Sequence, residues 1–106
     1  MRVISGIYKG RSLNGFDIDG TRPTMDRVKE SMFASIQNYI KDSIVLDLFA
    51  GSGSLGIEAI SNGCDICYFV DNNKIAINII KSNLDKIGIR SNILNKEFKD
   101  ALNYFK

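Results

Sequence analysis

Three glycines stand at the spacing of a nucleotide-cofactor loop: Gly51, Gly53 and Gly56 form the pattern G-x-G-x-x-G. They follow an apolar run, Ile44–Phe49, that predicts a buried strand of a parallel sheet, and they precede a short helix-forming segment. The first two glycines let the backbone turn sharply and let a ligand approach it, while Gly56 permits close packing of the helix on the strand. The pattern predicts a cofactor-binding loop. The alternative is a tight strand-to-helix turn that binds nothing.

Asp47 decides which cofactor we expect. A pyrophosphate at a helix N-terminus requires positive potential, and a carboxylate four residues before Gly51 works against it. The same carboxylate suits a ligand that is cationic at that end, and S-adenosylmethionine carries an ammonium and a sulfonium but no phosphate. More than forty residues also precede this unit, whereas dinucleotide domains often open with it. We therefore expect S-adenosylmethionine, with a nicotinamide-dependent oxidoreductase as the alternative.

A second acidic residue, Asp71, ends the next strand pattern, Ile66–Val70, twenty residues after Gly51. A carboxylate there can accept hydrogen bonds from the ribose hydroxyls of an adenosine. This spacing fits NAD and S-adenosylmethionine equally. Asp71 can also open the following helix together with Asn72 and Asn73, and the two roles are compatible.

Length and composition limit the remaining possibilities. At 106 residues the chain is one small domain with ordinary charged and apolar fractions. Neither a membrane-length apolar run nor a signal-peptide core is present, so we expect a cytoplasmic protein without a membrane partner. Cys64 and Cys67 straddle the entry to a strand, where we expect ordinary buried thiols and no metal site. Because the chain has no histidine, Ser-His-Asp and Cys-His mechanisms are excluded within it.

The positive charge is concentrated at the front of the chain. Residues 1–29 contain six basic and three acidic residues, a balance of +3, whereas the remainder contains eight basic and nine acidic residues, a balance of −1. The basic residues are Arg2, Lys9, Arg11, Arg22, Arg27 and Lys29. This balance indicates a polyanionic substrate, although solvated lysines and arginines are also the default protein surface.

The elements that hold these residues begin with a hairpin or a pair of short strands over residues 2–13, bent at Gly6 and Gly10. Thr24 has the features of a helix N-cap, with Asp26 in the first turn. The helix that follows has an apolar stripe, which we expect to pack on the domain. Its members are Val28, Met32, Ile36 and Tyr39–Ile40.

Beyond the glycines, helices and strands are expected to alternate. A short helix over residues 55–62 is closed by Gly63, and a longer one is capped by Asn73 and stopped by Gly88. A third strand covers residues 92–95, and apolar residues within 98–105 begin a further helix. This order predicts a doubly wound α/β sheet.

Three motifs in one order resemble a known family. They are Arg2-Val3-Ile4-Ser5-Gly6 with Lys9-Gly10-Arg11, then Thr21-Arg22-Pro23-Thr24-Met25-Asp26-Arg27-Val28-Lys29-Glu30 followed by Phe33, and Leu46-Asp47-Leu48-Phe49-Ala50-Gly51-Ser52-Gly53. Together they resemble the RsmD-type methyltransferases of bacteria, which methylate the exocyclic N2 of one guanine in 16S rRNA with S-adenosylmethionine. The resemblance runs from Arg2 to about the end of the chain.

The resemblance implies a Rossmann-like class I S-adenosylmethionine-dependent methyltransferase fold. This chain would hold the first three strands of its parallel sheet, preceded by the N-terminal β-hairpin and amphipathic helix. Residues 1–23 would be a basic hairpin and turn segment, and residues 24–106 the cofactor-binding domain. The implied partner is 16S rRNA of the small ribosomal subunit, and the full-length form is expected to be a monomer.

Site residues are also implied. The cofactor would be bound by Asp47, Phe49, Gly51, Ser52, Gly53 and Asp71, with Glu97 near the adenine amine. An equal alternative for Glu97 is a solvated acid at a helix start. The RNA would be contacted by Arg2, Lys9, Arg11, Arg22, Arg27 and Lys29, with exposed surface ion pairs as the alternative role of Arg27.

One family motif is missing. The family places a D-P-P-[YF] or N-P-P-[YF] box after the fourth strand, and this chain contains one proline, Pro23. We therefore expect the catalytic residues to lie beyond Lys106 and the chain to be the cofactor-binding part of a longer enzyme or a truncated product. In this fold the fourth strand lies beside Ile44–Phe49, so that strand would have an open edge here. A non-catalytic module that binds RNA or cofactor is the remaining alternative.

Overall fold

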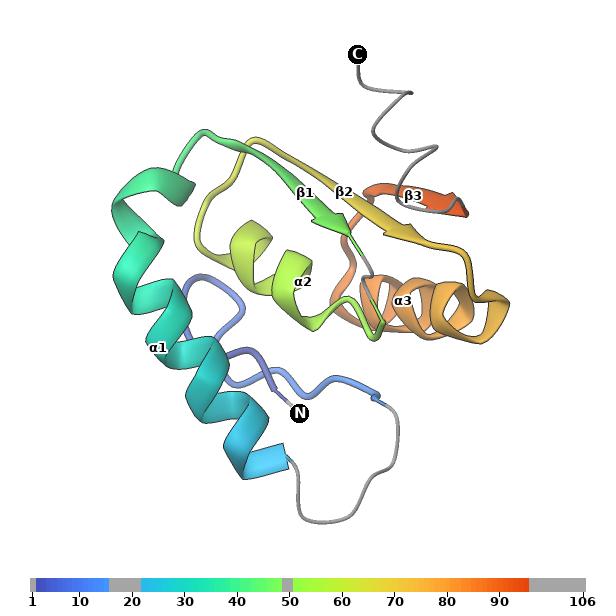
Figure 1. Ribbon diagram of the computed structural model, residues 1–106, viewed down its shortest axis with the longest axis horizontal. Coiled ribbons are helices and arrows are strands. Elements are labelled where there is room, and N and C mark those ends of the chain that lie inside the picture. Colours follow the sequence, from blue (N-terminus) through green and yellow to red (C-terminus); the bar gives the residue numbers. More distant parts are fainter. Residues whose placement is uncertain (1, 16–21, 49–50, 96–106) are drawn as a thin grey trace.

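The computed structural model describes residues 2–15, 22–48 and 51–95 (Figure 1). The elements alternate as expected from the sequence: α1 (Arg22–Ile40), β1 (Ile44–Leu48), α2 (Ser54–Ser61), β2 (Ile66–Asp71), α3 (Lys74–Ile87) and β3 (Asn92–Asn95). The helix expected within residues 98–105 lies outside the described residues. None of the described helices combines enough length and apolarity to cross a bilayer.

The strands form a parallel sheet in the order β1-β2-β3. Asp47 lies beside Phe69 in this sheet, and Asp71 lies beside Asn95. The two acidic residues therefore stand near the carboxyl ends of neighbouring strands, the edge at which open α/β sheets bind ligands. The parallel α/β prediction is confirmed.

The longest of the helices that follow a strand, α3, has the ends that its sequence predicts. The Asn73 side chain accepts a hydrogen bond from the Ile75 N–H at 2.8 Å, which satisfies one N–H of the first turn. At the other end Gly88 has a φ of 86°, a left-handed conformation that glycine adopts without strain. The predicted cap and stop of this helix are both confirmed.

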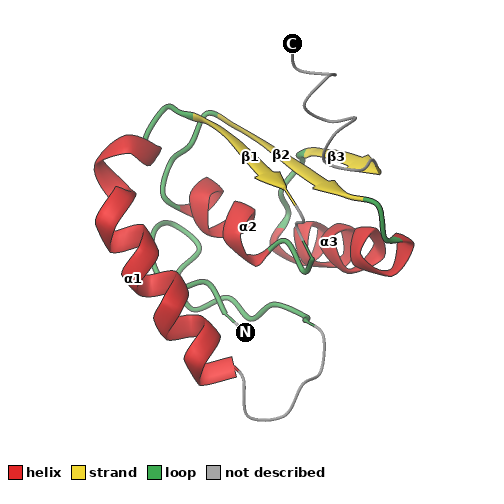
Figure 2. Ribbon diagram, viewed as in Figure 1, coloured by secondary structure: helices red, strands yellow, loops and turns green. Residues whose placement is uncertain are grey.

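The larger of two apolar clusters in the described residues joins the sheet, α2, α3 and the N-terminal segment. Helices α2 and α3 lie on the same side of the sheet (Figure 2). Ile57 of α2, Phe69 of β2 and Ile80 of α3 are fully buried there. Val3 and Leu13 belong to the same core, so the N-terminal segment packs into the domain.

The N-terminal segment is a bent loop closed by a single antiparallel bridge between Arg2 and Ser12. The Val3 N–H donates to the Arg11 carbonyl at 2.9 Å, and the Gly10 N–H donates to the Val3 carbonyl at 2.9 Å. The segment therefore folds back on itself as the hairpin prediction expected, but its two arms are joined by one bridge and do not form regular strands.

The start of α1 differs from the prediction. The helix begins at Arg22, two residues before the predicted N-cap Thr24, so Thr24 and Asp26 lie inside it. Pro23 is compatible with this earlier start, because an N–H in the first turn has no intrahelical partner to lose.

The predicted packing face of α1 is correct only at Ile40, which is buried. The other members of the stripe are exposed: Val28, Met32, Ile36 and Tyr39 are 61%, 38%, 40% and 80% exposed. The helix packs on α2 and β1 through Ile40 and through Phe33, a buried residue outside the predicted stripe. An apolar stripe shows which side chains favour burial, but the neighbouring elements decide which side of the helix is covered.

The exposed stripe borders the edge of the sheet. Within the described residues β1 has a strand partner on one side only. An apolar groove is lined by Met32 and Ile36 of α1, Val45 of β1 and Leu55 of α2. Met32 and Ile36 therefore face this groove and stay exposed.

Candidate cofactor site

The candidate site is built from two strand ends and the turn that connects β1 to α2. Asp47 lies near the end of β1, and Asp71 is the last residue of β2. We define residues 51–54 as the glycine loop. This loop contacts the end of β2, where the Gly51 N–H donates a hydrogen bond to the Asp71 carboxylate at 3.1 Å. The structure therefore brings together the two acidic residues and the loop that the sequence singled out.

The glycines of this turn are required for two different reasons. Gly51 and Gly53 have φ values of 59° and 82°, in the left-handed region that other residues rarely adopt. At Gly56 the reason is space, since a Cβ atom there would clash with the Phe69 ring and the Cys67 sulfur. The interpretation of Gly56 as a close-packing position is confirmed.

Asp47 is a buried carboxylate that accepts one hydrogen bond from the part of the chain that the structure describes. Its side chain accepts from the Gly56 N–H at 3.1 Å, and the residue is 7% exposed. Burial raises the pKa of Asp47 from 3.8 to about 7, although the Gly56 hydrogen bond lowers it and the charge of Asp71 raises it further. No cationic side chain of the described residues pairs with it. A cationic ligand would supply the missing partner.

The hydrogen bond to Asp47 also bears on the choice of cofactor. Gly56 lies in the first turn of α2, and its N–H points at a carboxylate of the same chain. A pyrophosphate needs such N–H groups free and needs positive potential around them. The geometry therefore disfavours a dinucleotide at this helix end.

Asp71 performs a local structural role and keeps capacity for a ligand. One carboxylate oxygen accepts from Gly51, and the other accepts from the Asn73 N–H at 2.8 Å. Asp71 thus supports the start of α3, as one interpretation of the sequence expected. Since each carboxylate oxygen can accept two hydrogen bonds, both oxygens can also accept from a pair of hydroxyls.

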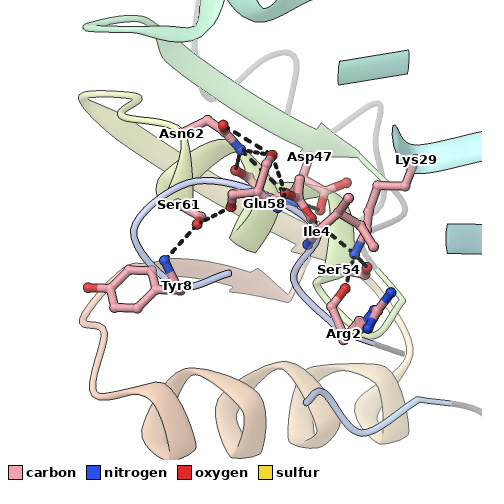
Figure 3. Close-up of polar contacts among 11 residues, drawn as sticks. Arg2, Ile4, Tyr8, Lys29, Asp47, Ser54, Glu58, Ser61 and Asn62 are labelled. Carbon is pink, nitrogen blue, oxygen red and sulfur yellow. Dashed lines mark hydrogen bonds and ion pairs between the residues drawn. The ribbon is translucent and has the colours of Figure 1, made fainter. Parts of the chain in front are cut away.

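Lys29 does not point to solvent. Its ammonium is buried between α1, α2 and the N-terminal segment (Figure 3). It donates to the Arg2 carbonyl at 2.7 Å and to the Ser54 hydroxyl at 2.8 Å, and it forms an ion pair with Glu58 at 3.2 Å. The prediction that Lys29 reaches RNA is therefore wrong, because all three of its N–H groups are engaged inside the protein.

Glu58 is the reason for that burial. It is fully buried in α2, and its two oxygens accept from the Ile4 and Ser5 N–H groups at 2.9 Å each (Figure 3). A buried carboxylate requires a counter-charge, which Lys29 supplies. The signal in the sequence was an acidic residue on the buried face of a short helix.

The burial of a second polar residue, Asn83, was also not predicted from the sequence. Its amide donates to the Ser52 carbonyl and to the Asn14 carbonyl at 2.8 Å each, and its oxygen accepts from the Asn14 N–H at 2.7 Å. The available signal was an amide inside the apolar stripe of α3, between Ile80 and Leu84.

The other predicted RNA residues lie on the surface. Arg2, Lys9, Arg11 and Arg27 are exposed. Arg11 also donates to the Lys86 carbonyl at 2.9 Å, which fastens it to the C-terminal end of α3. Phe49, Glu97 and the side chain of Arg22 lie outside the described part of the chain.

The prediction of buried thiols is confirmed for Cys67, whereas Cys64 is only partly buried. Cys64 and Cys67 form no disulfide. Burial raises the pKa of both thiols, so neither is a thiolate at neutral pH.

Comparison with known proteins identifies relatives of the whole chain. Residues 1–105 match the family described as Conserved hypothetical protein 95. Ribosomal RNA small subunit methyltransferase D of Haemophilus influenzae is 40% identical over 105 residues, which are 96% of this chain and 54% of the relative. YlbH of Bacillus subtilis, a candidate rRNA methyltransferase, is 57% identical over 84 residues, which are 79% of this chain and 46% of the relative.

Solved structures agree with these relatives. A candidate methyltransferase of Escherichia coli, yhhF, superimposes with a TM-score of 0.83 at 31% identity, over 96% of this chain and 55% of its own length. The fold is therefore the Rossmann-like fold of class I methyltransferases, as the sequence predicted. The chain spans about half the length of the curated relatives that it matches. Its match over residues 1–105 and its 40% identity to methyltransferase D establish that the chain belongs to the Conserved hypothetical protein 95 family, the RsmD-type family of rRNA methyltransferases.

Proposed function

We propose that this chain is the S-adenosylmethionine-binding part of an rRNA methyltransferase that acts on the exocyclic N2 of a guanine in 16S rRNA. The observation that carries the cofactor assignment is Asp47, a buried carboxylate beside the glycine loop that has no cationic partner among the described residues. A ligand with an ammonium group would satisfy it. A ligand with a pyrophosphate would add a like charge next to it.

Each predicted cofactor residue then has a distinct task. Asp47 pairs with the ammonium, and Asp71 accepts hydrogen bonds from the ribose hydroxyls. The glycine loop passes beneath the methionine part, where its small residues let the ligand approach the backbone. Phe49, Ser52 and Glu97 complete the pocket. When bound, S-adenosylmethionine supplies the activated methyl group, and the protein supplies binding and orientation.

The chain by itself is expected to be inactive. Transfer to a guanine amine needs a group that accepts the N2 protons and an aromatic residue that stacks on the base. The family box that holds these groups is not present in residues 1–106. Asp47 and Asp71 are committed to the cofactor in this proposal, so neither can replace the box. Methylation of undermethylated 30S subunits by this chain alone, above background, would refute this part of the proposal.

Cofactor binding can be tested without catalysis. In a ¹H–¹⁵N spectrum of the labelled chain, the amides of Gly51, Gly53 and Gly56 should shift when S-adenosylmethionine or S-adenosylhomocysteine is added. Asp71→Ala should weaken this binding by about 1–3 kcal/mol, because hydroxyl groups of the ligand would lose their acceptors. Asp85→Ala, an exposed acid at the far end of α3, is the matched control. Glycine shifts with NAD but none with S-adenosylmethionine would overturn the cofactor assignment.

The RNA-binding surface is proposed to include Arg2, Lys9, Arg11 and Arg27. The support for it is their exposure and their position on the N-terminal segment and α1. Arg27→Ala should weaken binding to a 16S rRNA fragment and reduce the slope of log K against log salt by about one. Lys41→Ala, an exposed cation just beyond the opposite end of α1, is the control. Equal salt slopes for the two variants and the unmodified chain would exclude Arg27 from the RNA surface.

A further inference from the structure

We propose that Lys29 and Asn83 are positioning residues that fix the shape of the glycine loop by tying it to the N-terminal segment at two points. The inference rests on the proposed cofactor role of that loop. Both side chains are buried, and both are remote from the sequence of the loop, since Lys29 comes from α1 and Asn83 from α3.

The contacts of Lys29 join three parts of the molecule. Its ammonium donates to the Ser54 hydroxyl at the end of the glycine loop and to the Arg2 carbonyl at the start of the N-terminal segment. Glu58 balances its charge from within α2 (Figure 3). These three contacts use all three N–H donors of the ammonium, so Lys29 has no donor left for a ligand.

Asn83 makes the corresponding connection at the middle of the loop. Its amide donates to the Ser52 carbonyl and to the Asn14 carbonyl, and its oxygen accepts from the Asn14 N–H. Both amide donors are therefore engaged, and the residue is fully buried. Asn83 holds the backbone of the loop on one side and the far end of the N-terminal segment on the other.

Both connections link the glycine loop to the same N-terminal segment. Arg2 and Ser12 are paired by the antiparallel bridge, so Arg2 and Asn14 belong to one closed segment. That segment is bonded to the glycine loop through Lys29 at Ser54 and through Asn83 at Ser52. The loop contains two glycines in the left-handed region and therefore has little intrinsic preference for one shape. Two buried, fully hydrogen-bonded side chains are well suited to select that shape before the ligand arrives.

Two pairs of variants of the whole 106-residue chain test the proposal. Asn83→Ala should weaken binding of S-adenosylhomocysteine by about tenfold, since the hydrogen bonds that fix Ser52 are lost. Leu84→Ala is the matched control, because it truncates the neighbouring side chain of α3, which is buried in the apolar core. The control should lower the melting temperature at least as much but bind the ligand normally.

The second pair of variants distinguishes the role of Lys29 as the counter-charge of Glu58 from its role in positioning the glycine loop. Lys29→Met leaves Glu58 without its counter-charge, and Lys29→Met combined with Glu58→Gln removes that charge. The double variant should regain thermal stability relative to Lys29→Met, while its affinity for S-adenosylhomocysteine stays about tenfold below that of the unmodified chain. Ser54→Ala removes the loop side of the same contact and tests it if the Lys29 variants do not fold.

The outcomes distinguish this inference from the proposed function. If the unmodified chain does not bind the ligand at all, the proposed function fails. If the unmodified chain binds and Asn83→Ala and Ser54→Ala bind equally well, the positioning role is wrong. The role is also wrong if ligand affinity simply follows melting temperature across all variants, Leu84→Ala included.

Discussion

The substitution Asp47→Asn should remove most of the pH dependence of this chain's stability near neutral pH. Burial raises the pKa of Asp47 in the folded state from 3.8 to about 7, so the folded protein binds this proton more tightly than the unfolded chain does. Its contribution to stability is fully present below pH 3.8 and is lost as the pH rises through about 7.

The size of the effect follows from those two pKa values. A difference between 3.8 and about 7 corresponds to on the order of 4 kcal/mol in total. Between pH 5 and pH 8 the free energy of unfolding should fall by about 2–3 kcal/mol. The chain has no histidine, so no imidazole titration overlaps this window.

Urea unfolding followed by circular dichroism at pH 5, 6, 7 and 8 measures this change. Asparagine keeps the shape of the side chain and can still accept from the Gly56 N–H, so Asp47→Asn should show a nearly flat profile and should be the more stable protein at pH 8. It should also lose affinity for S-adenosylmethionine, because an amide cannot neutralise an ammonium. Asp85→Asn, at an exposed position, should keep the slope of the unmodified chain. Identical slopes for Asp47→Asn and the unmodified chain would show that Asp47 does not titrate near neutral pH.

Three further outcomes are expected. Gly56→Ala should lower the free energy of unfolding by about 1–3 kcal/mol in thermal melts, because the added methyl group meets the Phe69 ring, and an unchanged melting temperature would contradict that packing. Asn73→Ala should cost about 1 kcal/mol by removing the cap of α3, whereas Asn73→Asp should cost much less. At pH 7.5 the native chain should react slowly with Ellman's reagent, with Cys67 slower than the partly exposed Cys64, and fast reaction of Cys67 would contradict its burial.

Much of the fold was determined by local sequence. The start and end of α3 followed from Asn73 and Gly88, because an N-cap and a left-handed C-cap depend on a few neighbouring residues. The strands β2 and β3 and the turn at the glycine loop could be predicted because their sequence patterns also lie within a few neighbouring residues. The candidate cofactor site could also be predicted, because Asp47 and Asp71 each lie near the end of a predicted strand. Parallel strands that end at one edge of the sheet bring the two residues together.

What only the tertiary structure decided was which side of α1 is covered and what its polar residues do. A helical pattern shows that Val28, Met32 and Ile36 lie on one face, but that face is exposed. The buried side of α1 is the one that carries Phe33 and Ile40, which pack with Ala59 of α2. Lys29 and Arg27 are both basic residues on one helix, yet the first is enclosed beside Glu58 and the second is exposed. Such differences come from partners distant in sequence, as with Asn83 and Ser52, and no periodicity along the chain encodes them. A buried charge or amide is stable only where the folded chain supplies its hydrogen bonds, so its role is fixed by the assembled fold.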